Sequence, residues 1–305
     1  MATKFEPSYV VSKLNRNIFT VRCSPKGDLA DWEQWFLLTS DRHWDNPKSD
    51  WDLQIEHLKE ARKRNAGIID CGDFFCAMQG KYDPRSSKND LRPEHQGADY
   101  LDSLVNTASD FFMPYADQFI VIGRGNHEAN ILKRHETDLI GRMTEQIKYR
   151  SGHKIHSGGY GGFVRFSVEQ QNTVGKKYLS YGKGLTLHYS HGYGGGGPVT
   201  KGVIQTNRKA VYLPDADIVI SGHIHEAWKL DLVRLRLGRN MTYHDVQTHV
   251  CIPTYKEEFK DGHGGWHVER GAPPKPIGAT WLRLFFKYER LDRTKGIDYE
   301  IIQAR

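Results

Sequence analysis

The sequence is poor in cysteine and contains no long hydrophobic run. It has four cysteines, which form no CxxC pair and are too few for a fold held together by disulfides. No stretch of eighteen apolar residues exists, and the first seven residues lack the apolar core of a signal peptide. We therefore expect a reduced, cytoplasmic protein with no membrane partner.

Basic residues outnumber acidic ones. The 43 lysines and arginines against 37 acidic residues give a net charge of +6 and a pI near 9.0. This balance favours a polyanionic partner only weakly, because many ordinary basic proteins share it. Hydrophobic residues make up 38% of the 305 positions, which is enough for a sizeable core, and many of the 15 histidines lie in loops that follow strands.

The first half of the chain alternates between short apolar runs and amphipathic segments. The apolar runs at 34–38, 67–69 and 119–122 predict buried strands. Between and after them, apolar residues at helical spacing predict three helices, at about 51–61, 97–112 and 137–149. Strand and helix in alternation indicate a parallel sheet with crossover helices.

The second half reads mainly as β-structure. The runs expected to be strands are 163–168, 185–190, 217–220, a hairpin of 229–237 and 241–252, and closing strands 280–286 and 299–303. We expect a helix at about 200–212, a Gly/Pro-rich loop at 261–278, a polar lead-in at 1–16 and an edge strand at 17–21. No repeat or linker interrupts the chain, so we predict one domain, 1–305, with two packed sheets and a motif-bearing core at about 34–252, followed by the closing segment 253–305.

Polar side chains capable of binding metal follow five of the predicted strands. They are Asp41, His43, Asp73, Asn126, His127, His191, His223 and His225. Carboxylate, imidazole and carboxamide groups without a thiolate suit Mn, Fe, Zn, Co or Ni ions. The ligands are too many for one ion. Two ions that share one carboxylate fit the number better, and such pairs lie about 3.5–4 Å apart in phosphoryl hydrolases.

The order of these motifs resembles that of the calcineurin-like metallophosphoesterase superfamily. The matching motifs, between residues 41 and 225, are Asp-x-His, Gly-Asp, Gly-Asn-His-Glu, His-Gly and Gly-His-x-His. The resemblance implies a four-layer α/β/β/α sandwich: two mixed β-sheets flanked by helices, with a dinuclear metal site at the strand carboxyl ends.

The resemblance also implies a role for each site residue. Asp41, His43 and His225 would hold one ion, Asn126, His191 and His223 the other, and Asp73 would bridge them. His127 would face the substrate as the catalytic residue, while a water between the two ions becomes a hydroxide that attacks phosphorus. Manganese is the favoured metal.

Several further residues are assigned to supporting roles. His191 is preferred over His188 as a ligand, because His191 ends a strand and precedes Gly192. His188, Asp45 and Glu128 are expected to support the ligands or His127 from behind. The basic residues proposed to contact substrate are Arg85, Lys88, Arg124 and Arg208.

Three functions remain open at this stage. A phosphodiesterase acting on DNA or RNA is favoured, because Gly72-Asp73-Phe74-Phe75 resembles the Gly-Asp-x-Phe of the superfamily's repair exonucleases, although Cys76 stands where those enzymes usually have histidine. A phosphomonoesterase is second: Arg124–Glu128 resembles the serine/threonine phosphatases, but the arginine of their Gly-Asp-x-x-Asp-Arg-Gly motif is missing. A non-catalytic scaffold is the remote alternative, because every ligand position is filled.

Overall fold

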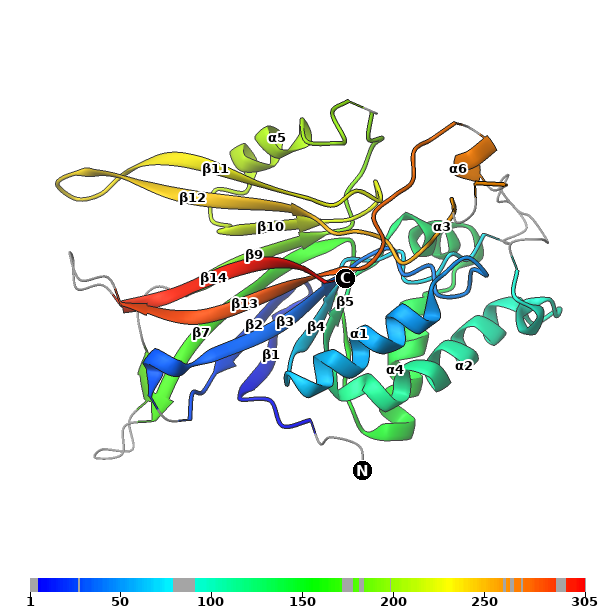
Figure 1. Ribbon diagram of the computed structural model, residues 1–305. Coiled ribbons are helices and arrows are strands. Elements are labelled where there is room, and N and C mark those ends of the chain that lie inside the picture. Colours follow the sequence, from blue (N-terminus) through cyan, green and yellow to red (C-terminus); the bar gives the residue numbers. More distant parts are fainter. Residues whose placement is uncertain are drawn as a thin grey trace.

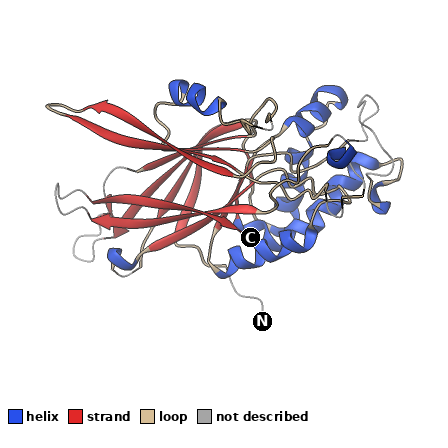
Figure 2. Ribbon diagram, turned by 45° about the horizontal axis from the view of Figure 1, so that its top comes forward, coloured by secondary structure: helices blue, strands red, loops and turns tan. Residues whose placement is uncertain are grey.

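The computed structural model describes residues 5–26, 28–78, 91–171, 178–180, 184–197, 199–259, 262–263, 266–269, 271–288 and 295–304. Two mixed β-sheets lie face to face, and helices flank them (Figures 1 and 2). This confirms the α/β class that the alternation of strands and helices predicts. Among the described residues, no helix combines the length and the apolar character that crossing a membrane requires.

The first sheet has six strands and carries the βαβ part of the chain. Its order is β14 (Lys295–Ala304), β13 (Ala279–Tyr288), β3 (Glu33–Thr39), β4 (Gly67–Asp70), β5 (Phe119–Ile122) and β6 (His156–Ser157). Strands β3 to β6 are parallel, whereas β13 is antiparallel to both β3 and β14. The parallel strands bring their carboxyl ends to one edge of the sheet.

The second sheet has eight strands. They are β1 (Tyr9–Asn15), β2 (Ile18–Cys23), β7 (Gly161–Gln171), β9 (Leu185–Ser190), β10 (Ile218–Ser221), β12 (Thr242–Cys251) and β11 (Trp228–Leu237), with β8 (Tyr178–Ser180) paired to β7. The predictions for the N-terminus are wrong here. Residues 9–15 form the edge strand, and β2 lies between β1 and β7. In the run 9–15 only Tyr9 is buried and the last three residues are exposed, so its apolar residues follow neither the alternating nor the continuous pattern that predicts a strand.

The helices are α1 (Trp51–Lys63), α2 (Tyr100–Phe112), α3 (Asn126–His135), α4 (Leu139–Ser151), α5 (Gln205–Tyr212) and α6 (Trp266–Glu269). Helices α1, α2 and α4 cover the outer face of the first sheet through a cluster that includes Leu58, Leu104 and Met143. Asp50 caps α1 by accepting a hydrogen bond from the Leu53 N–H at 2.9 Å. Helix α3 has no counterpart in the sequence prediction.

A second apolar cluster fills the space between the two sheets. Leu38, Ile69 and Val121 come from the first sheet, and Val164 and Ile220 from the second. The outer face of the second sheet packs a much smaller cluster of Leu213, Ala216 and Val219 next to α5. The order of layers is therefore α/β/β/α, with the fourth layer reduced to one short helix.

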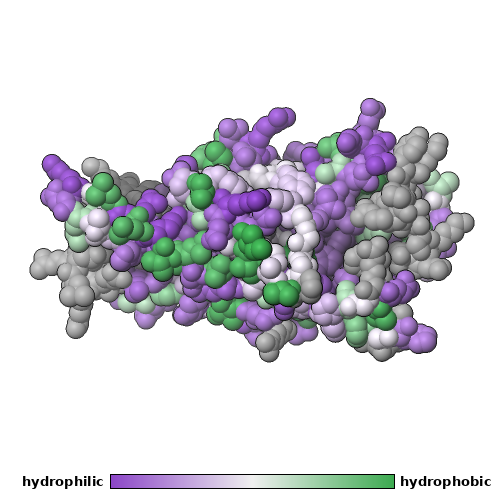
Figure 3. All heavy atoms as spheres, turned by 90° about the horizontal axis from the view of Figure 1, so that it is seen from above, coloured by the Kyte–Doolittle hydropathy of each residue, from purple (hydrophilic) through white to green (hydrophobic). Residues whose placement is uncertain are grey.

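The β11–β12 hairpin projects beyond the body of the molecule (Figure 1). Its exposed apolar side chains include Val233, Leu235 and Leu237, and α5 exposes Val211. Seen from above, apolar patches lie among polar ones on this side of the molecule (Figure 3). The strand ends that carry the predicted ligands lie at the opposite end of the hairpin, where β10 and β12 meet the helices.

Candidate metal centre

The loops that follow β3 and β4 run side by side. The Asp41 N–H donates to the Gly72 carbonyl at 2.9 Å, and the His43 N–H donates to the Asp73 carbonyl at 3.0 Å. These bonds continue the parallel pairing of β3 with β4 past the ends of both strands. The two motifs are therefore fixed against each other by backbone bonds.

Five of the predicted site residues have a left-handed backbone. Their φ angles are 50° at Asp41, 42° at His43, 50° at Asp73, 75° at His223 and 52° at His225. For a residue other than glycine this conformation costs on the order of 1–3 kcal/mol, and it is concentrated at functional sites. The surrounding structure must stabilise these turns. Because of the turns, the side chains point toward one site instead of alternating between two faces, as they would along a strand.

One group of side chains comprises Asp41, His43 and His225. The His225 Nε2 lies 3.2 Å from Asp41 Oδ1, and the His43 Nε2 lies 3.3 Å from the His225 Nε2 and 3.8 Å from Asp41 Oδ1. Two ring nitrogens and one carboxylate oxygen thus face a common point. This arrangement is suited to binding a cation.

A second group lies beside the first and comprises Asn126, His191 and His223. The Asn126 Oδ1 lies 2.8 Å from His223 Nδ1 and 3.1 Å from His191 Nε2, and these two ring nitrogens are 3.3 Å apart. The histidines of Ser221–His225 therefore belong to different groups, His223 to this one and His225 to the other. Because both have left-handed backbones, one intervening residue is enough to separate them.

Asp73 and Asp41 connect the two groups. Asp73 Oδ2 lies 3.0 Å from His191 Nε2, and Asp41 Oδ1 lies 4.0 Å from the same nitrogen. Both carboxylates are almost fully buried. A buried carboxylate requires a compensating positive charge, so two of them at one point make the site strongly favourable for cations.

The protonation states in the site follow from burial and mutual charge. Burial opposes ionisation of Asp41 and Asp73, but the nearby histidines outweigh it and lower the pKa of both carboxyl groups. Burial lowers the pKa of His43 and His223, which leaves neutral rings with a lone pair to offer. For His191 burial also opposes charge, yet Asp73 and Asp41 raise its pKa to about 9. The donor set fits divalent cations of the Mn, Fe, Zn and Co type.

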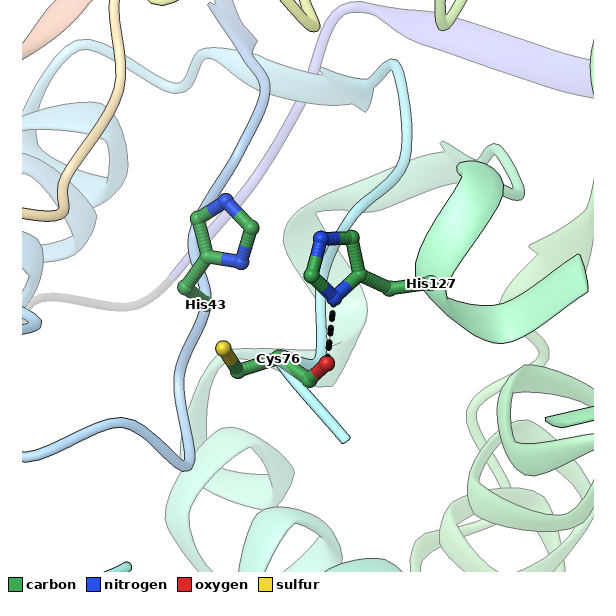
Figure 4. A group of neighbouring side chains, drawn as sticks. All are labelled: His43, Cys76 and His127. Carbon is green, nitrogen blue, oxygen red and sulfur yellow. Dashed lines mark hydrogen bonds between the residues drawn. The ribbon is translucent and has the colours of Figure 1, made fainter. Parts of the chain in front are cut away.

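His127 lies beside the two groups and is held by the loop that follows β4. Its Nδ1–H donates to the Cys76 carbonyl (Figure 4), and its backbone N–H donates to Asp73 Oδ1 at 2.9 Å. A carbonyl can only accept, so the proton is fixed on Nδ1 and Nε2 faces Asp73 Oδ2, 3.6 Å away. This nitrogen is the one presented toward the site.

Two buried carboxylates hold the backbone around His127. Glu128 accepts from the N–H groups of Asp73, Phe75 and Gly125 at 3.2, 2.7 and 2.8 Å. Burial and the Asp73 charge raise the pKa of Glu128 to about 8. Asp45 accepts from Cys76 N–H at 2.5 Å and Ala77 N–H at 2.9 Å, so it acts on His127 through the Cys76 carbonyl.

Arg42, between two of the predicted ligands, was not predicted to support the site. Asp41 and His43 both turn into the centre, so Arg42 points the other way, where it is fully buried. Its Nε donates to Asp70 Oδ2 at 2.7 Å and its Nη1 to Gln54 Oε1 at 3.0 Å. The charged residue inside the Asp-x-His motif is the sequence signal that marks this internal ion pair.

The segment after β12 also reaches the centre, which the sequence did not disclose. Thr254 Oγ1 and the Tyr255 N–H both donate to the Asp41 carbonyl, at 2.8 and 3.1 Å. Figure 1 shows this segment running from β12 toward α6, across the end of the molecule that carries the loops. It stabilises the strained turn at Asp41 from a distance of more than 200 residues along the chain.

The same segment places a charged group near the centre. Lys256 forms an ion pair with Glu258, and the other Glu258 oxygen lies 3.4 Å from His267 Nδ1. The His267 ring is 6.5 Å from the His225 ring, centroid to centroid. The Lys256 charge contributes to the low pKa of His43. Lys256 and His267 therefore border the predicted ligands.

The remaining predicted residues lie apart from these groups or outside the described part of the chain. Arg124 pairs with Asp138 at 2.6 Å, and Arg208 is exposed on α5. Arg85 and Lys88 lie outside the described residues. His188 packs against the Phe163 ring, with centroids 4.8 Å apart, on the face of the second sheet that carries α5. Their predicted roles in substrate binding and ligand support stay predictions.

Comparisons with known proteins give only distant structural similarity. No protein-family model matches the sequence, and no curated protein matches it. Vacuolar protein sorting 29 from Cryptosporidium parvum is 12% identical, with 90% of this chain and 100% of that chain covered and a TM-score of 0.32. Vps29 complexed with zinc from Entamoeba histolytica is 9% identical, covering 88% and 99%, with a TM-score of 0.31.

GAP50, described as the anchor in the inner membrane complex of Plasmodium, is 10% identical to this chain. The similarity covers 90% of this chain and 89% of GAP50, with a TM-score of 0.41. At such values the similarity identifies neither an activity nor a partner for this chain. The evidence for its function lies in its own residues.

Proposed function

We propose that this protein is a metal-dependent phosphoester hydrolase, and specifically a phosphodiesterase that acts on nucleic acid. The observation that carries the proposal is the convergence of two adjacent ligand groups on buried Asp41 and Asp73. Asp41, His43 and His225 would hold one divalent ion and Asn126, His191 and His223 the other, with Asp73 between them. When bound, the ions supply Lewis acidity toward a phosphoryl group and an attacking water.

His127 is the catalytic residue in this proposal. Its tautomer is set by the Cys76 carbonyl, and its Nε2 is directed toward the space beside Asp73. A proton carried on Nε2 can be donated to the leaving oxygen or can stabilise charge on the phosphoryl group. Asp45 and Glu128 hold the loop that orients this ring, and are positioning residues.

The small number of positively charged side chains at the site favours a phosphodiester over a phosphomonoester substrate. A phosphomonoester is a dianion and calls for an arginine fork, yet the segment after Asp73 contains no arginine up to Met78. Lys256, already shared with Glu258, supplies one cation at the border of the site. One such group suits the single negative charge of a phosphodiester, and the net charge of +6 suits a polyanionic substrate.

A substrate panel tests the proposal. Protein loaded with Mn²⁺ is assayed on bis-p-nitrophenyl phosphate, p-nitrophenyl phosphate, and single- and double-stranded DNA and RNA. We expect hydrolysis of the diester and of at least one nucleic acid. Hydrolysis of the monoester alone would establish the phosphatase alternative, and binding of two ions without any hydrolysis would favour a scaffold.

Lys256 provides a sharper test of substrate binding. Lys256→Ala should lower kcat/KM for the diester by roughly tenfold to a hundredfold, because a hydrogen bond to a charged group contributes about 1.5–3 kcal/mol. Lys256→Arg should recover part of the loss. Lys229→Ala, an exposed lysine on β11, is the matched control and should behave like the wild type.

A further inference from the structure

Cys76 lies next to the predicted centre but belongs to neither ligand group. A ligand atom of Cys76, one of His43 and one of His127 all lie within 4.8 Å of one another. Figure 4 shows the sulfur of Cys76 on the side of the chain that faces His43, with the His127 ring alongside. The residues Cys76, His43 and His127 are 2%, 2% and 9% exposed. They form a cluster with one sulfur and two nitrogen donors.

The neighbours of this cluster are arranged as they are around a metal ligand. The Cys76 carbonyl holds the Nδ1 proton of His127, which leaves the Nε2 lone pair of the ring to bind. The Asn46 Nδ2 donates to the Cys76 sulfur at 3.4 Å, an interaction that stabilises a thiolate. Among the described residues, the buried His43 Nδ1 has no hydrogen-bond partner. Figure 4 shows that this nitrogen is directed toward Cys76 and His127.

We infer that Cys76, His127 and His43 form a third, inhibitory metal site that takes a soft divalent cation such as Cd²⁺ or Zn²⁺. On binding, a metal–sulfur bond and metal–nitrogen bonds form, the Cys76 S–H and His43 Nδ1–H bonds break, and both protons leave to solvent, so that His43 would bind this ion through Nδ1 and the first ion through Nε2. A hard ion such as Mn²⁺ does not prefer sulfur ligands, so this site should bind soft cations in preference to hard ones.

The consequence for activity rests on the proposed function. An ion held by His127 Nε2 removes the nitrogen that faces the substrate, so the cation should inhibit without displacing the two Mn²⁺ ions. Binding itself does not depend on any activity. Metal binding and inhibition can therefore be measured separately.

The binding test is a Cd²⁺ titration of Mn²⁺-loaded protein, followed by ultraviolet thiolate-to-cadmium charge-transfer absorption. We expect a band that saturates at one Cd²⁺ per chain, and that is absent in Cys76→Ser. Cys251→Ser removes another buried free cysteine and should keep the band. His127→Gln keeps the sulfur and should weaken Cd²⁺ affinity at least tenfold. No saturating band in the wild type, or a full band in Cys76→Ser, would overturn the site.

The inhibition test compares each protein with itself. Cd²⁺ at a concentration that saturates the band should reduce wild-type diester hydrolysis at least tenfold, whereas the same addition to Cys76→Ser should change its rate less than twofold. Equal inhibition of the two proteins would refute an inhibitory role. If the wild type hydrolyses no phosphoester, the proposed function fails, and the absorption band still decides the metal site.

Discussion

His127 shows how much one backbone carbonyl can determine. The ring has two nitrogens, and the Cys76 carbonyl fixes which of them carries the proton. The other nitrogen then faces the site with a lone pair or, once protonated, with a proton to give. The tautomer of this residue is therefore set by the backbone of Cys76 and not by its side chain.

Replacement of His127 should separate catalysis from metal binding. We expect His127→Gln to lower kcat for a diester by roughly 10²–10⁴, the usual contribution of a general acid or base. The number of bound Mn²⁺ ions, measured by titration calorimetry, should remain two. His153→Gln is the matched control, because this histidine is exposed just after α4 and should leave kcat unchanged. Loss of one ion in His127→Gln would contradict the division of roles.

Two buried histidines away from the centre make the free energy of unfolding depend on pH. Burial, and then the Arg42 charge, lower the pKa of His57 to about 4; burial, then Lys209 and Arg234, lower that of His249 to about 4. Above pH 6.5 both are neutral in the folded and the unfolded chain. As pH falls from 6.5 toward 4, the unfolded chain binds protons first, so the free energy of unfolding decreases.

We expect a loss of roughly 1–3 kcal/mol for each of these histidines between pH 7 and pH 4. Urea unfolding followed by circular dichroism measures it. His57→Gln should flatten the pH dependence, while replacement of the exposed His244 by glutamine should leave it as in the wild type. An unchanged pH dependence in His57→Gln would show that His57 does not contribute.

At the scale of elements, the turn from β5 into α3 leaves no room for a side chain. Gly125 precedes α3, and a Cβ at this position would overlap the carboxylate and backbone nitrogen of Asp73. Gly125→Ala should therefore push Asp73 away and lower Mn²⁺ affinity at least tenfold, measured by calorimetry. Gly195→Ala, where a Cβ meets nothing within 4 Å, is the control and should bind as the wild type does. Equal Mn²⁺ affinity in both variants would show that the loop accommodates the added methyl group without displacing Asp73.

The sequence predicted the strands best where apolar residues form an uninterrupted run. The runs that became β3, β4, β5 and β10 are continuous and apolar, and they end where polar motifs begin. Helix α3 was missed because its first turn consists of the motif residues themselves, which mask any apolar period. The left-handed turns could not be foreseen either, since Asp and His rarely adopt them without support from distant residues.

At the scale of the molecule, the centre depends on parts of the chain that carry no motif. From the sequence, the ligands could be assigned to one site because each follows a predicted strand. The carboxyl ends of such strands meet at one edge of the sheet. It could not show that Thr254 and Tyr255 bind the Asp41 carbonyl, or that β13 pairs with β3 beneath the first motif. Such contacts depend on the folded path of the chain, and local composition does not encode them.

Metal binding should couple this centre to the stability of the whole fold. The buried Asp41 and Asp73 carboxylates and the five left-handed turns all cost free energy that a bound cation offsets. One site held at a hundred times its Kd stabilises the folded state by about 2.7 kcal/mol. For two sites we expect the Tm in Mn²⁺ to exceed that in a chelator by on the order of 10 °C.

The shift must come from the centre itself. Asp73→Asn should lose most of it, because it removes the carboxylate placed between the two groups, whereas His127→Gln should retain it. The Asp73→Asn protein without metal should also be no less stable than the wild type without metal, because the buried charge is gone. A full metal-dependent shift in Asp73→Asn, measured by calorimetry at matched ion concentrations, would place the stabilising ions elsewhere in the molecule.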